Sequence, residues 1–452
     1  MEAVINHQRA FYLAKKTLSL ERRWAILEVL EQTLKNNEIL IEQALFADFG
    51  KSGFETYTTE LGMLYEEISR TKRDLKKWIK PKRVRTNWVN WPAQSYILFE
   101  PLGVNLIIGA WNYPVLLLLQ PAVSALAAGN TVVLKPSENA PHIAALFQEL
   151  IDKNFDPAHL ALIQADAQKT QKILALAWDH IFFTGSTQVG KIVYQAAAEQ
   201  LIPVTLELGG KSPAIITPHC DVALTAKRLV WGKFLNAGQT CVAPDYVLIH
   251  ESVKDAFLNA CVVAIEKAQY GPGSNNYCQI INERHMDRLV KLLDQNKVYY
   301  GGSIDAKKRF IAPTIMTDVT FDDAVMKEEI FGPILPVMTY QNLNDALAQV
   351  KTLDKPLAAY VFSENKKEVA SILNDLSFGG GAVNDVVMHL TNPNLPFGGI
   401  GKSGLGAYHG YHGYLRFSHQ KSILHKNNWF ELPLKYAPLT AKKLKWIRKI
   451  LK

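Results

Sequence analysis

The sequence predicts an α/β protein in which buried parallel strands alternate with covering helices, behind a helical amino-terminal region. Three observations support this fold class. From residue 103 to residue 210, apolar runs suited to strands alternate with segments of helical spacing. Within these runs apolar residues are consecutive, as in strands buried on both faces of a parallel sheet. The chain has 452 residues, 48% of them hydrophobic, which suffices for two or three domains with a sizeable core.

The first eighty residues are expected to be helical, because apolar side chains recur there at helical spacing. These side chains are Leu20, Trp24, Leu27, Leu30 and Leu34. Residues 81–94 are basic and aromatic and show little helical pattern. We therefore expect helices up to about residue 80 and a non-helical segment before the first buried strand.

The parallel sheet is expected between residues 103 and 210. Its predicted strands are GVNLIIGA, TVVLKP, LALIQA, DHIFFTG and PVTLELGG. Its predicted helices are 115–128, 141–153, a short helix before DHIFFTG, and 187–199. Gly129 and Asn130 directly follow the first of these helices, and glycine in that place is a common helix C-cap.

A second α/β region is expected from about residue 210 to residue 392. Its predicted strands are TCVAPDYVLIH, GGSI and AAYVFS. The segment 397–424 is rich in glycine and aromatic residues and ends in FSHQKSIL. We expect this last stretch to form an edge strand.

The formal net charge is +8, with 50 Lys and Arg against 42 Asp and Glu. Such a balance can indicate an anionic partner, but a mildly basic enzyme is the simpler interpretation. No nucleic-acid-binding motif accompanies the charge, so we expect no nucleic-acid partner. Much of the excess lies near the carboxyl end, at Lys435, Lys442, Lys443, Lys445, Arg448, Lys449 and Lys452.

The cysteines are few and widely spaced. They are Cys220, Cys241, Cys261 and Cys278. They form neither a CxxC pair nor a metal-ligand spacing, so we expect no metal site and no disulfide framework. The amino terminus lacks the apolar core of a signal peptide, and the apolar stretch 104–134 is interrupted by polar residues, proline and glycine. We therefore expect a cytoplasmic protein.

Seven motifs occur in a fixed order along the chain. They are EPLGVNLIIGAWNYP, AGNTVVLKPSE, FFTGSTQVGK, LELGGKSP, FLNAGQTCVAPDYV, EEIFGPILPV and PFGGIGKSGLGAYHG. Each alone is weak, but together they resemble the aldehyde dehydrogenase superfamily from about residue 100 to residue 424. The chain is most similar to the class 3 branch, in its segments GQTCVAPDYVL and GAYHG and in its short amino-terminal part.

The resemblance implies an aldehyde dehydrogenase-like fold with a Rossmann-type cofactor domain, an α/β catalytic domain and a small β bridging region that serves oligomerisation. The implied ranges are 1–80 and 100–208 for the cofactor domain, 209–392 for the catalytic domain, 81–99 and 393–437 for the bridging region, and 438–452 for a tail. It also implies a homodimer that oxidises medium- or long-chain aliphatic or aromatic aldehydes with NAD or NADP.

Cys241 is the expected nucleophile. A thiolate attacks a carbonyl, and an ordinary cysteine with a pKa of about 8.5 is mostly protonated at neutral pH. A buried, inert thiol is the usual alternative, and it suits the other three cysteines better than Cys241, which follows Gly-Gln-Thr in a turn. By resemblance, the side-chain amide of Asn112 and the backbone N–H of Cys241 stabilise the oxyanion. Asn112 could otherwise be a simple turn residue before Tyr113 and Pro114.

Glu207 is the expected base that activates water to hydrolyse the thioester. It ends a predicted buried strand, where desolvation raises the pKa of a carboxylate toward neutrality. The alternative is a charged residue that caps the strand. The nearby Gly209 and Gly210 favour the catalytic interpretation, because glycine lets substrate and cofactor approach the backbone closely.

Cofactor residues are expected in four of the motifs. Gly185, Ser186 and Gly190 lie between a strand and a helix, where backbone N–H groups can bind a pyrophosphate, although a serine-capped turn would look the same. The resemblance implies the remaining contacts: Lys135 and Glu138 to the adenosine ribose, Leu208 to the nicotinamide, Glu329 to the nicotinamide ribose, and Phe331 packed beside it. A surface charge and a core aromatic are the alternatives for Glu329 and Phe331. The Glu138 carboxylate favours NAD, and the class 3 branch also accepts NADP.

Substrate residues are harder to predict. Tyr113, Trp231 and Thr240 flank catalytic motifs and are candidates for the lining of an apolar aldehyde tunnel. Core packing is the alternative for the two aromatic residues. The tail interleaves basic residues with Leu444, Trp446, Ile447, Ile450 and Leu451. On a helix this pattern gives an apolar and a cationic face that suits an anionic membrane surface, although the helix could also pack on the enzyme or lie in solvent.

Two other functions compete with aldehyde oxidation. An acylating dehydrogenase or acyl reductase passes the thioester to coenzyme A or phosphate and has no need of a hydrolytic base, so Glu207 argues against it. A non-catalytic protein that reuses the fold would be expected to lack a nucleophile or a base. The sequence has Cys241, Glu207 and Asn112, which favours the enzyme.

Overall fold

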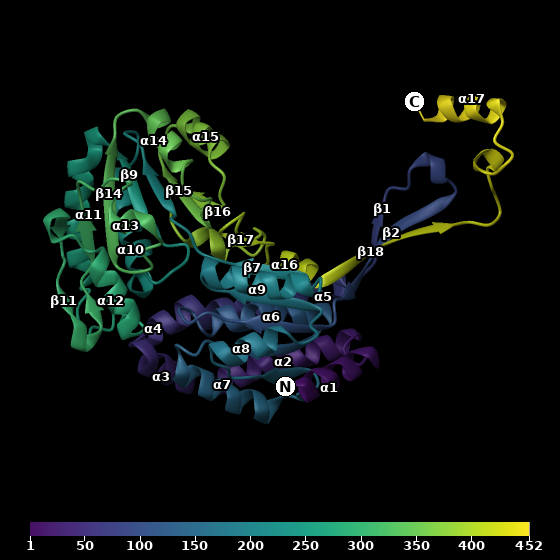
Figure 1. The fold of residues 1–452 in the computed structure, drawn as a ribbon, viewed down its shortest axis with the longest axis horizontal. Helices are drawn as coiled ribbons and strands as arrows, with labels where there is room; N and C mark the ends of the chain where they lie inside the picture. The colour runs from purple at the N-terminus through teal and green to yellow at the C-terminus, as the bar shows by residue number, and fades with distance from the viewer. Residues whose placement is uncertain (452) are drawn as a thin grey trace.

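The computed structural model describes residues 1–451, which form two α/β bodies and a narrow projecting arm (Figure 1). The amino-terminal region is helical as predicted. Its helices are α1 (Glu2–Leu13), α2 (Leu20–Asn36), α3 (Glu38–Phe49), α4 (Gly53–Thr56) and α5 (Gly62–Trp78). A π-helical turn, Tyr57–Leu61, joins α4 to α5. Helices α2 and α5 pack against α6 of the first body, so this region covers one face of its sheet.

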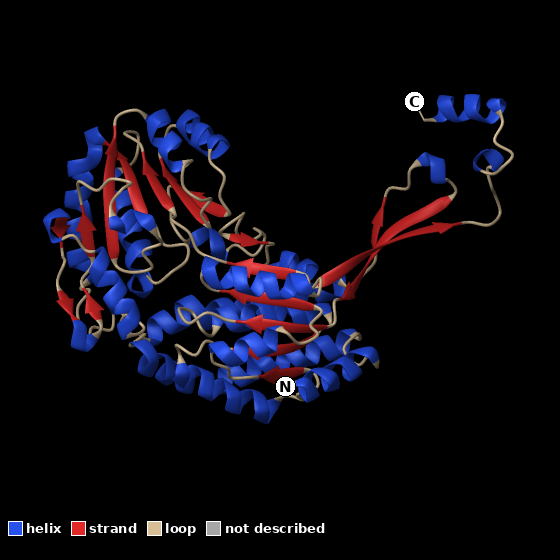
Figure 2. Ribbon diagram, in the orientation of Figure 1, coloured by secondary structure: helices blue, strands red, loops and turns tan. Residues whose placement is uncertain are grey.

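The first body contains a six-stranded sheet in the order β17-β7-β6-β3-β4-β5. Its parallel strands are β3 (Val104–Ile108), β4 (Thr131–Lys135), β5 (Leu160–Leu162), β6 (His180–Thr184) and β7 (Val204–Glu207). Its helices are α6 (Leu116–Ala128), α7 (Pro141–Asn154), α8 (Ala167–Leu174) and α9 (Thr187–Glu199). Every residue of these five strands is buried, which confirms the predicted parallel sheet with covered faces (Figure 2).

Helix α6 illustrates how the sequence ends an element. All thirteen of its residues are buried, because it lies between the sheet and the amino-terminal helices. Gly129 closes it in the left-handed conformation, with φ +94°, and its N–H donates back to the last turn. This confirms the C-cap predicted at Gly129, because glycine adopts that backbone without steric cost.

The second body contains a seven-stranded sheet in the order β10-β13-β14-β9-β8-β15-β16. The strands are β8 (Pro213–Ile216), β9 (Tyr246–His250), β10 (Val298–Tyr300), β13 (Thr314–Met316), β14 (Ile334–Tyr340), β15 (Ala358–Phe362) and β16 (Gly380–Val383). The helices are α10 (Val222–Phe234), α11 (Lys254–Ala268), α12 (Glu283–Leu292), α13 (Ala324–Lys327), α14 (Leu343–Val350) and α15 (Lys366–Asp375). Only β10 runs antiparallel to its neighbour.

Two predicted strands of this body are corrected. TCVAPDYVLIH is extended only from Tyr246, because residues 240–245 form the turn that carries Cys241. GGSI contributes only β11 (Ile304–Asp305), which pairs with β12 (Phe310–Ile311) in a separate two-stranded ribbon. AAYVFS forms β15 as predicted.

The arm is a three-stranded antiparallel sheet in the order β1-β2-β18. Its strands are β1 (Lys82–Val84), β2 (Ala93–Pro101) and β18 (Ser418–Lys426). FSHQKSIL therefore forms the predicted edge strand. The preceding segment contributes α16 (Gly410–Arg416) and β17 (Gly404–Leu405), and β17 joins the first body's sheet rather than the arm. The domain boundaries given above stay a prediction.

The chain ends beyond the arm in helix α17 (Ala441–Ile450), shown in yellow in Figure 1. It carries no buried residue. Between residues 1 and 451 no helix combines the length and apolar character that crossing a membrane requires. In that same range no three His, Cys, Asp or Glu side chains are grouped to hold a metal ion.

Candidate active site

The candidate site lies where the parallel strands of the first body end. Lys135 is the last residue of β4, Glu207 is the last residue of β7, and Gly185 directly follows β6. Asn112 lies in the loop after β3. Ligands of open α/β sheets bind in the crevice outside the carboxyl ends of the strands. The predicted cofactor and catalytic residues therefore meet at one edge of this sheet.

Glu207 has a carboxylate that is 3% exposed. Neither of its carboxylate oxygens has a hydrogen-bond partner. Burial raises the pKa of Glu207 well above its ordinary value, and the positive charge of Arg416 only partly opposes this. The predicted direction of the pKa shift is confirmed. A buried carboxylate without partners is costly to keep, which is typical of a group that meets a ligand or a reacting water.

Cys241 lies in a turn that follows a 3₁₀ segment, Leu235–Gly238. It is half-buried and lines a cavity, whereas Cys261 and Cys278 are buried in the core. Burial, together with the charges of Glu329 and Glu207, raises the pKa of the thiol to about 12, and the N–H groups of Cys241 and Val242 oppose that rise. The resting side chain is therefore a thiol, and a positive charge must enter the site to favour the thiolate.

Asn112 is buried directly beside the turn that carries Cys241. Its side-chain Nδ2 donates to the carbonyl of Gln239 at 3.0 Å, and its own carbonyl accepts from Asn236 Nδ2 at 3.0 Å. A primary amide carries two N–H donors, so one remains beyond the contact with Gln239. The structure thus brings Asn112 and the Cys241 turn together, although they are distant in the sequence.

The three predicted substrate residues line one cavity of about 860 Å³ together with Cys241. The hydroxyl of Tyr113 lies 2.6 Å from Thr240 Oγ1, so these two side chains are fixed to each other. Trp231 is 40% exposed and faces the same cavity. Most of the lining is aliphatic or aromatic, and Glu55 is its one carboxylate. Such a cavity suits an apolar ligand.

The turn between β6 and α9 has the features of a phosphate site. Ser186 caps α9, since its Oγ accepts the N–H of Val189. A Cβ on Gly185 would lie 2.6 Å from the Phe183 ring, and one on Gly190 would lie 2.6 Å from Leu208. The glycines therefore keep the backbone and the helix start close to the strands, where N–H groups can bind an anion.

Lys135 and Glu138 form an ion pair of 2.6 Å at the end of β4. Burial works against ionisation of Glu138, but the hydrogen bond and charge of Lys135 together with a backbone hydrogen bond outweigh it and lower the pKa. Glu138 is therefore a carboxylate at neutral pH and can accept ribose hydroxyls. Lys135 is almost fully buried beneath it.

Glu329, Phe331 and Leu208 are the residues expected at the nicotinamide end of the cofactor. Burial and the charge of Asp245 raise the pKa of Glu329 to about 8. Phe331 has φ +49° and packs edge-to-face on Trp111 at 5.3 Å. Leu208 is buried, and its N–H donates to the carbonyl of Ser403 at 3.0 Å. A dinucleotide fits these features: two glycines next to the start of α9, where N–H groups can bind an anion, and the Lys135–Glu138 pair, which can bind ribose hydroxyls.

Comparison with known proteins identifies the family. The profile of the aldehyde dehydrogenase family matches residues 1–423. The 4,4'-diaponeurosporen-aldehyde dehydrogenase of Staphylococcus aureus is 44% identical over 98% of this chain and 97% of its own length. The chain belongs to the aldehyde dehydrogenase family.

Further relatives refine this placement. The dimeric NADP-preferring aldehyde dehydrogenase of Rattus norvegicus is 42% identical over 97% of this chain and 98% of its own. Aldehyde dehydrogenase family 3 member A2 of Pongo abelii is 41% identical over 99% and 93%, which confirms the predicted class 3 branch. A substrate-bound structure of AldH from Staphylococcus aureus superposes with a TM-score of 0.97 at 43% identity, over 100% of this chain and 99% of that chain.

The protein is therefore an NAD(P)-dependent oxidoreductase that converts an aldehyde to the carboxylic acid, and an acylating reaction is not favoured. The predicted fold is confirmed by the superposition. The roles given above to single residues of the dehydrogenase rest on their geometry and on the resemblance.

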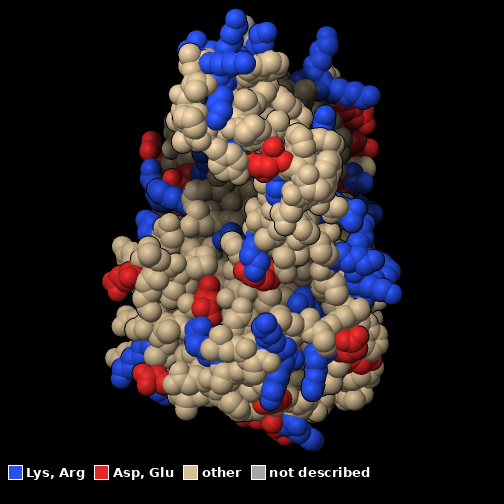
Figure 3. Space-filling model, turned by 90° about the vertical axis from the view of Figure 1, so that its right-hand side faces the viewer, with Lys and Arg blue, Asp and Glu red and all other residues tan. Residues whose placement is uncertain are grey.

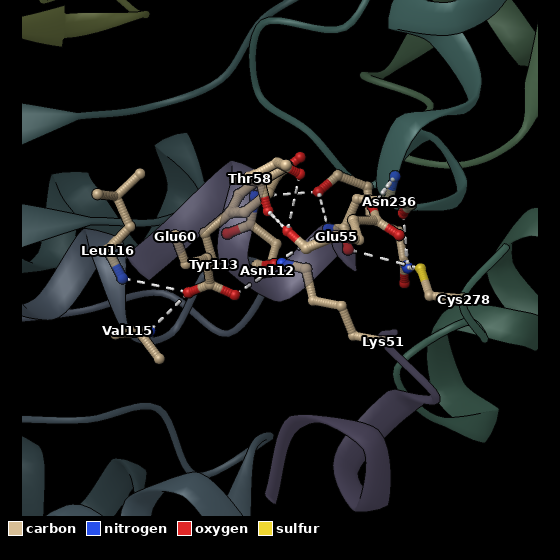
Figure 4. Close-up of polar contacts among 12 residues, drawn as sticks. Lys51, Glu55, Thr58, Glu60, Asn112, Tyr113, Val115, Leu116, Asn236 and Cys278 are labelled. Atoms are coloured by element: carbon tan, nitrogen blue, oxygen red, sulfur yellow. Dashed lines mark hydrogen bonds and ion pairs between the residues drawn. The ribbon is translucent and has the colours of Figure 1, made fainter. Parts of the chain in front are cut away.

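Sequence reasoning missed three residues of the dehydrogenase that contact the catalytic turns: Glu55, Glu60 and Asn236 (Figure 4). Glu55 and Glu60 lie in a short helical stretch that looks like the rest of the amino-terminal region. Asn236 sits in a left-handed conformation, with φ +54°. No local pattern marks Glu55 or Glu60, because their partners lie far away in the sequence, whereas Asn236 stands in the motif FLNAGQTCVAPDYV without any signal that points to its partners.

Proposed function

We propose that this enzyme oxidises a medium- or long-chain aliphatic or aromatic aldehyde, with Cys241 as nucleophile and Glu207 as base. One observation carries the proposal. Cys241 is a half-buried thiol that lines an apolar cavity, and it feels the charge of Glu207, a buried carboxylate without hydrogen-bond partners at the end of β7. No other cysteine lines that cavity.

The reaction begins when the Cys241 thiol gives up its proton to solvent and the Sγ thiolate attacks the carbonyl carbon, which forms a thiohemiacetal oxyanion. The negative charge that develops on the carbonyl oxygen is stabilised by the second N–H of Asn112 Nδ2 and by the Cys241 backbone N–H. A bound nicotinamide dinucleotide supplies the hydride acceptor and a positive charge that favours the thiolate. The product of this stage is a thioester on Cys241.

Glu207 completes the reaction by hydrolysis. Its carboxylate takes a proton from water, the resulting hydroxide attacks the thioester carbon, and the acid leaves as Cys241 regains its thiol. The raised pKa suits this role, because burial makes the ionised carboxylate a stronger base toward water than an exposed one.

The size and lining of the cavity support the substrate class. A volume of about 860 Å³ accepts an aldehyde much larger than acetaldehyde, and its aromatic and aliphatic walls offer few polar partners. The Staphylococcus aureus relative is named for a diaponeurosporen aldehyde, which agrees with a bulky apolar substrate.

For the cofactor, Glu138 supports a preference for NAD, since its carboxylate repels a 2′-phosphate. Lys135, 2.6 Å from Glu138, supports acceptance of NADP as well. The rat relative is named as NADP-preferring, so measured affinities for both cofactors decide the order.

We further propose a homodimer formed through the arm. The edge strand β18 exposes most of its residues, and exposed strand edges pair readily with another strand. The rat relative is named as dimeric. Light scattering of the intact enzyme tests this. A monomer mass at micromolar concentration would contradict it.

We also propose a cytoplasmic enzyme whose tail binds an anionic membrane surface. Lys442, Lys443 and Arg448 share α17 with exposed Leu444 and Trp446, and Figure 3 shows Lys and Arg gathered at the upper end of the molecule. An amphipathic cationic helix of this kind binds at the headgroup level. Co-sedimentation with phosphatidylserine vesicles should fall when the chain ends at Pro438. Equal co-sedimentation of the two forms would contradict the proposal.

The catalytic proposal is tested by substituting the nucleophile. Cys241→Ala should abolish NAD(P)H formation with every aldehyde, and acid should form without coenzyme A in the wild-type enzyme. Cys220→Ala is the matched control, because Cys220 is half-buried but does not line the cavity. Full activity in Cys241→Ala would contradict the assignment.

A further inference from the structure

Two buried carboxylates lie close together in the amino-terminal region and take no part in the reaction described above. Glu55 is 8% exposed and Glu60 is fully buried. They lie in α4 and in the following π-helical turn, so one short stretch of chain carries both. Figure 4 shows that their side chains reach toward the loops that hold the catalytic residues.

Glu60 holds the loop that carries Asn112. Its Oε2 accepts the N–H groups of Val115 and Leu116 at 2.8 and 3.1 Å, so it caps the start of α6 just after Asn112. Its Oε1 pairs with the fully buried Lys51 at 2.7 Å. The charge is therefore balanced, as a buried carboxylate requires.

Glu55 holds the turn that carries Cys241. Its Oε1 accepts the backbone N–H of Asn236 at 2.7 Å. Asn236 has φ +54° and ψ 32°, a left-handed conformation that asparagine adopts more readily than most residues. The hydrogen bond that Asn236 N–H donates to this buried carboxylate helps to keep the backbone in this less favoured state.

Asn236 then connects the two catalytic segments. Its side-chain Nδ2 donates to the carbonyl of Asn112 at 3.0 Å and to the carbonyl of Gln239 at 3.1 Å. Gln239 also accepts from Asn112 Nδ2 at 3.0 Å. Asn112 is thus fixed relative to Gln239, which lies two residues before Cys241.

We propose that Glu55 is a positioning residue for the oxyanion site: through Asn236 it sets the distance between the Asn112 amide and the Cys241 backbone N–H. The inference rests on the aldehyde oxidation proposed above. Oxyanion donors act only when they are placed in advance, so a small displacement of either donor lowers the rate. The aldehyde and the cofactor need not contact Glu55 for this effect.

The role of Glu55 depends on its acceptor oxygen and not on its charge. Burial raises the pKa of Glu55, so ionisation is disfavoured at a site lined by apolar side chains. A glutamine keeps a carbonyl oxygen of the same reach, whereas an alanine removes the acceptor and leaves the Asn236 N–H unpaired. The two substitutions therefore separate hydrogen bonding from acid-base chemistry.

The test is the rate at which NAD(P)H forms during the first turnover, here called the burst rate, with a saturating aromatic aldehyde. Loss of one preorganised donor costs ~10²–10³ in rate, so for displaced donors we expect Glu55→Ala to lower the burst rate by about 10–100-fold. The KM for the cofactor should stay within about threefold of wild type, because Glu55 is not among the expected cofactor contacts, whereas Glu55 lines the aldehyde cavity and the KM for the aldehyde is not used as a criterion. Glu55→Gln should retain most of the burst rate.

Asp179→Ala is the matched control. Asp179 also accepts a buried-strand N–H, that of Val104 at 2.7 Å, but at the opposite end of β3 from Asn112. We expect lower thermal stability and an unchanged burst rate. Asn236→Gly provides a second variant that tolerates φ +54° and removes only the side-chain bridge, and its burst should fall as in Glu55→Ala.

The outcomes separate the inference from the function. Equal losses in Glu55→Gln and Glu55→Ala would overturn the positioning role and indicate a charged or proton-transferring group. A wild-type burst rate in Glu55→Ala or in Asn236→Gly would overturn it too. A wild-type enzyme that forms no NAD(P)H from any aldehyde would instead contradict the aldehyde oxidation itself.

Discussion

The carboxylate of Glu329 lies so close to the backbone of Gly209 that a Cβ at position 209 would stand 1.9 Å from Oε2. The N–H of Gly210 donates to the same carboxylate and favours its ionised form. Because Gly209 has no side chain, the Glu329 carboxylate has room to reach the place where the nicotinamide ribose is expected.

Gly209→Ala should displace Glu329 and weaken cofactor binding. Loss of one hydrogen-bonding group corresponds to about 1.4 kcal/mol, so we expect a roughly tenfold rise in the dissociation constant for NAD(P). Fluorescence titration of the enzyme with cofactor measures it. Gly271→Ala is the control, because a Cβ there has no heavy atom within 4 Å. Equal affinities in the two variants would argue against the crowding at position 209.

Glu138→Gln should shift the cofactor preference toward NADP. The substitution removes a partly exposed negative charge beside the expected 2′-position while Lys135 keeps its positive charge. Solvent screening limits the effect, and we expect about a tenfold rise in the ratio of kcat/KM for NADP to that for NAD. Glu149→Gln, which changes an exposed carboxylate on α7, should leave the ratio unchanged. A ratio that stays constant in Glu138→Gln would place the 2′-phosphate elsewhere.

Trp231→Ala should impair long-chain and aromatic aldehydes selectively. The ring lines the cavity that contains Cys241, and its loss removes apolar contact with the distal part of a large substrate. We expect about a tenfold fall in kcat/KM for a long-chain aldehyde and little change for acetaldehyde. Trp24→Ala is the control, since Trp24 is 44% exposed against 40% for Trp231 and lies outside the cavity. A uniform fall for all aldehydes would indicate a structural role.

Glu207→Gln should make the folded protein more stable than wild type, and this difference in stability should increase as the pH rises. Burial raises the pKa of Glu207 in the folded state, so the folded protein keeps a proton that the unfolded chain has already lost. The native state therefore binds more protons, and wild-type stability falls as the pH rises above about 4.3, the unfolded value, until it passes the raised folded pKa. The difference in melting temperature, variant minus wild type, should grow over this range. A difference independent of pH would contradict the raised pKa.

Much of the first body followed from local pattern. Its strands have consecutive apolar residues, and two of them end at expected cofactor or catalytic residues, Lys135 and Glu207. Gly129 marks the end of α6. Because parallel strands align their carboxyl ends, the motifs that follow these strands lie together at one edge of the sheet. The resemblance supplied the roles of Cys241 and Asn112.

The remaining features depend on contacts between distant segments. The composition of residues 240–245 predicts a strand, but these residues form a turn. The hydrogen bond between Asn112 and Gln239 holds that turn. The bond from Asn236 to Glu55 spans 181 residues, and Glu55 has no local signal that points to its partner. The pairing of Gly404 with Glu207 likewise joins a late segment to the first sheet. Tertiary packing decided each of these cases.

The central claim is a covalent acyl adduct on Cys241 that Glu207 helps to hydrolyse. The most direct measurement is the intact mass of Glu207→Gln after incubation with an aromatic aldehyde and NAD(P). We expect a mass gain equal to the aldehyde minus two hydrogens, located on Cys241 by peptide mapping, with one equivalent of NAD(P)H formed and no steady turnover. NAD(P)H formation with Cys241 unmodified, or sustained turnover in this variant, would contradict the account.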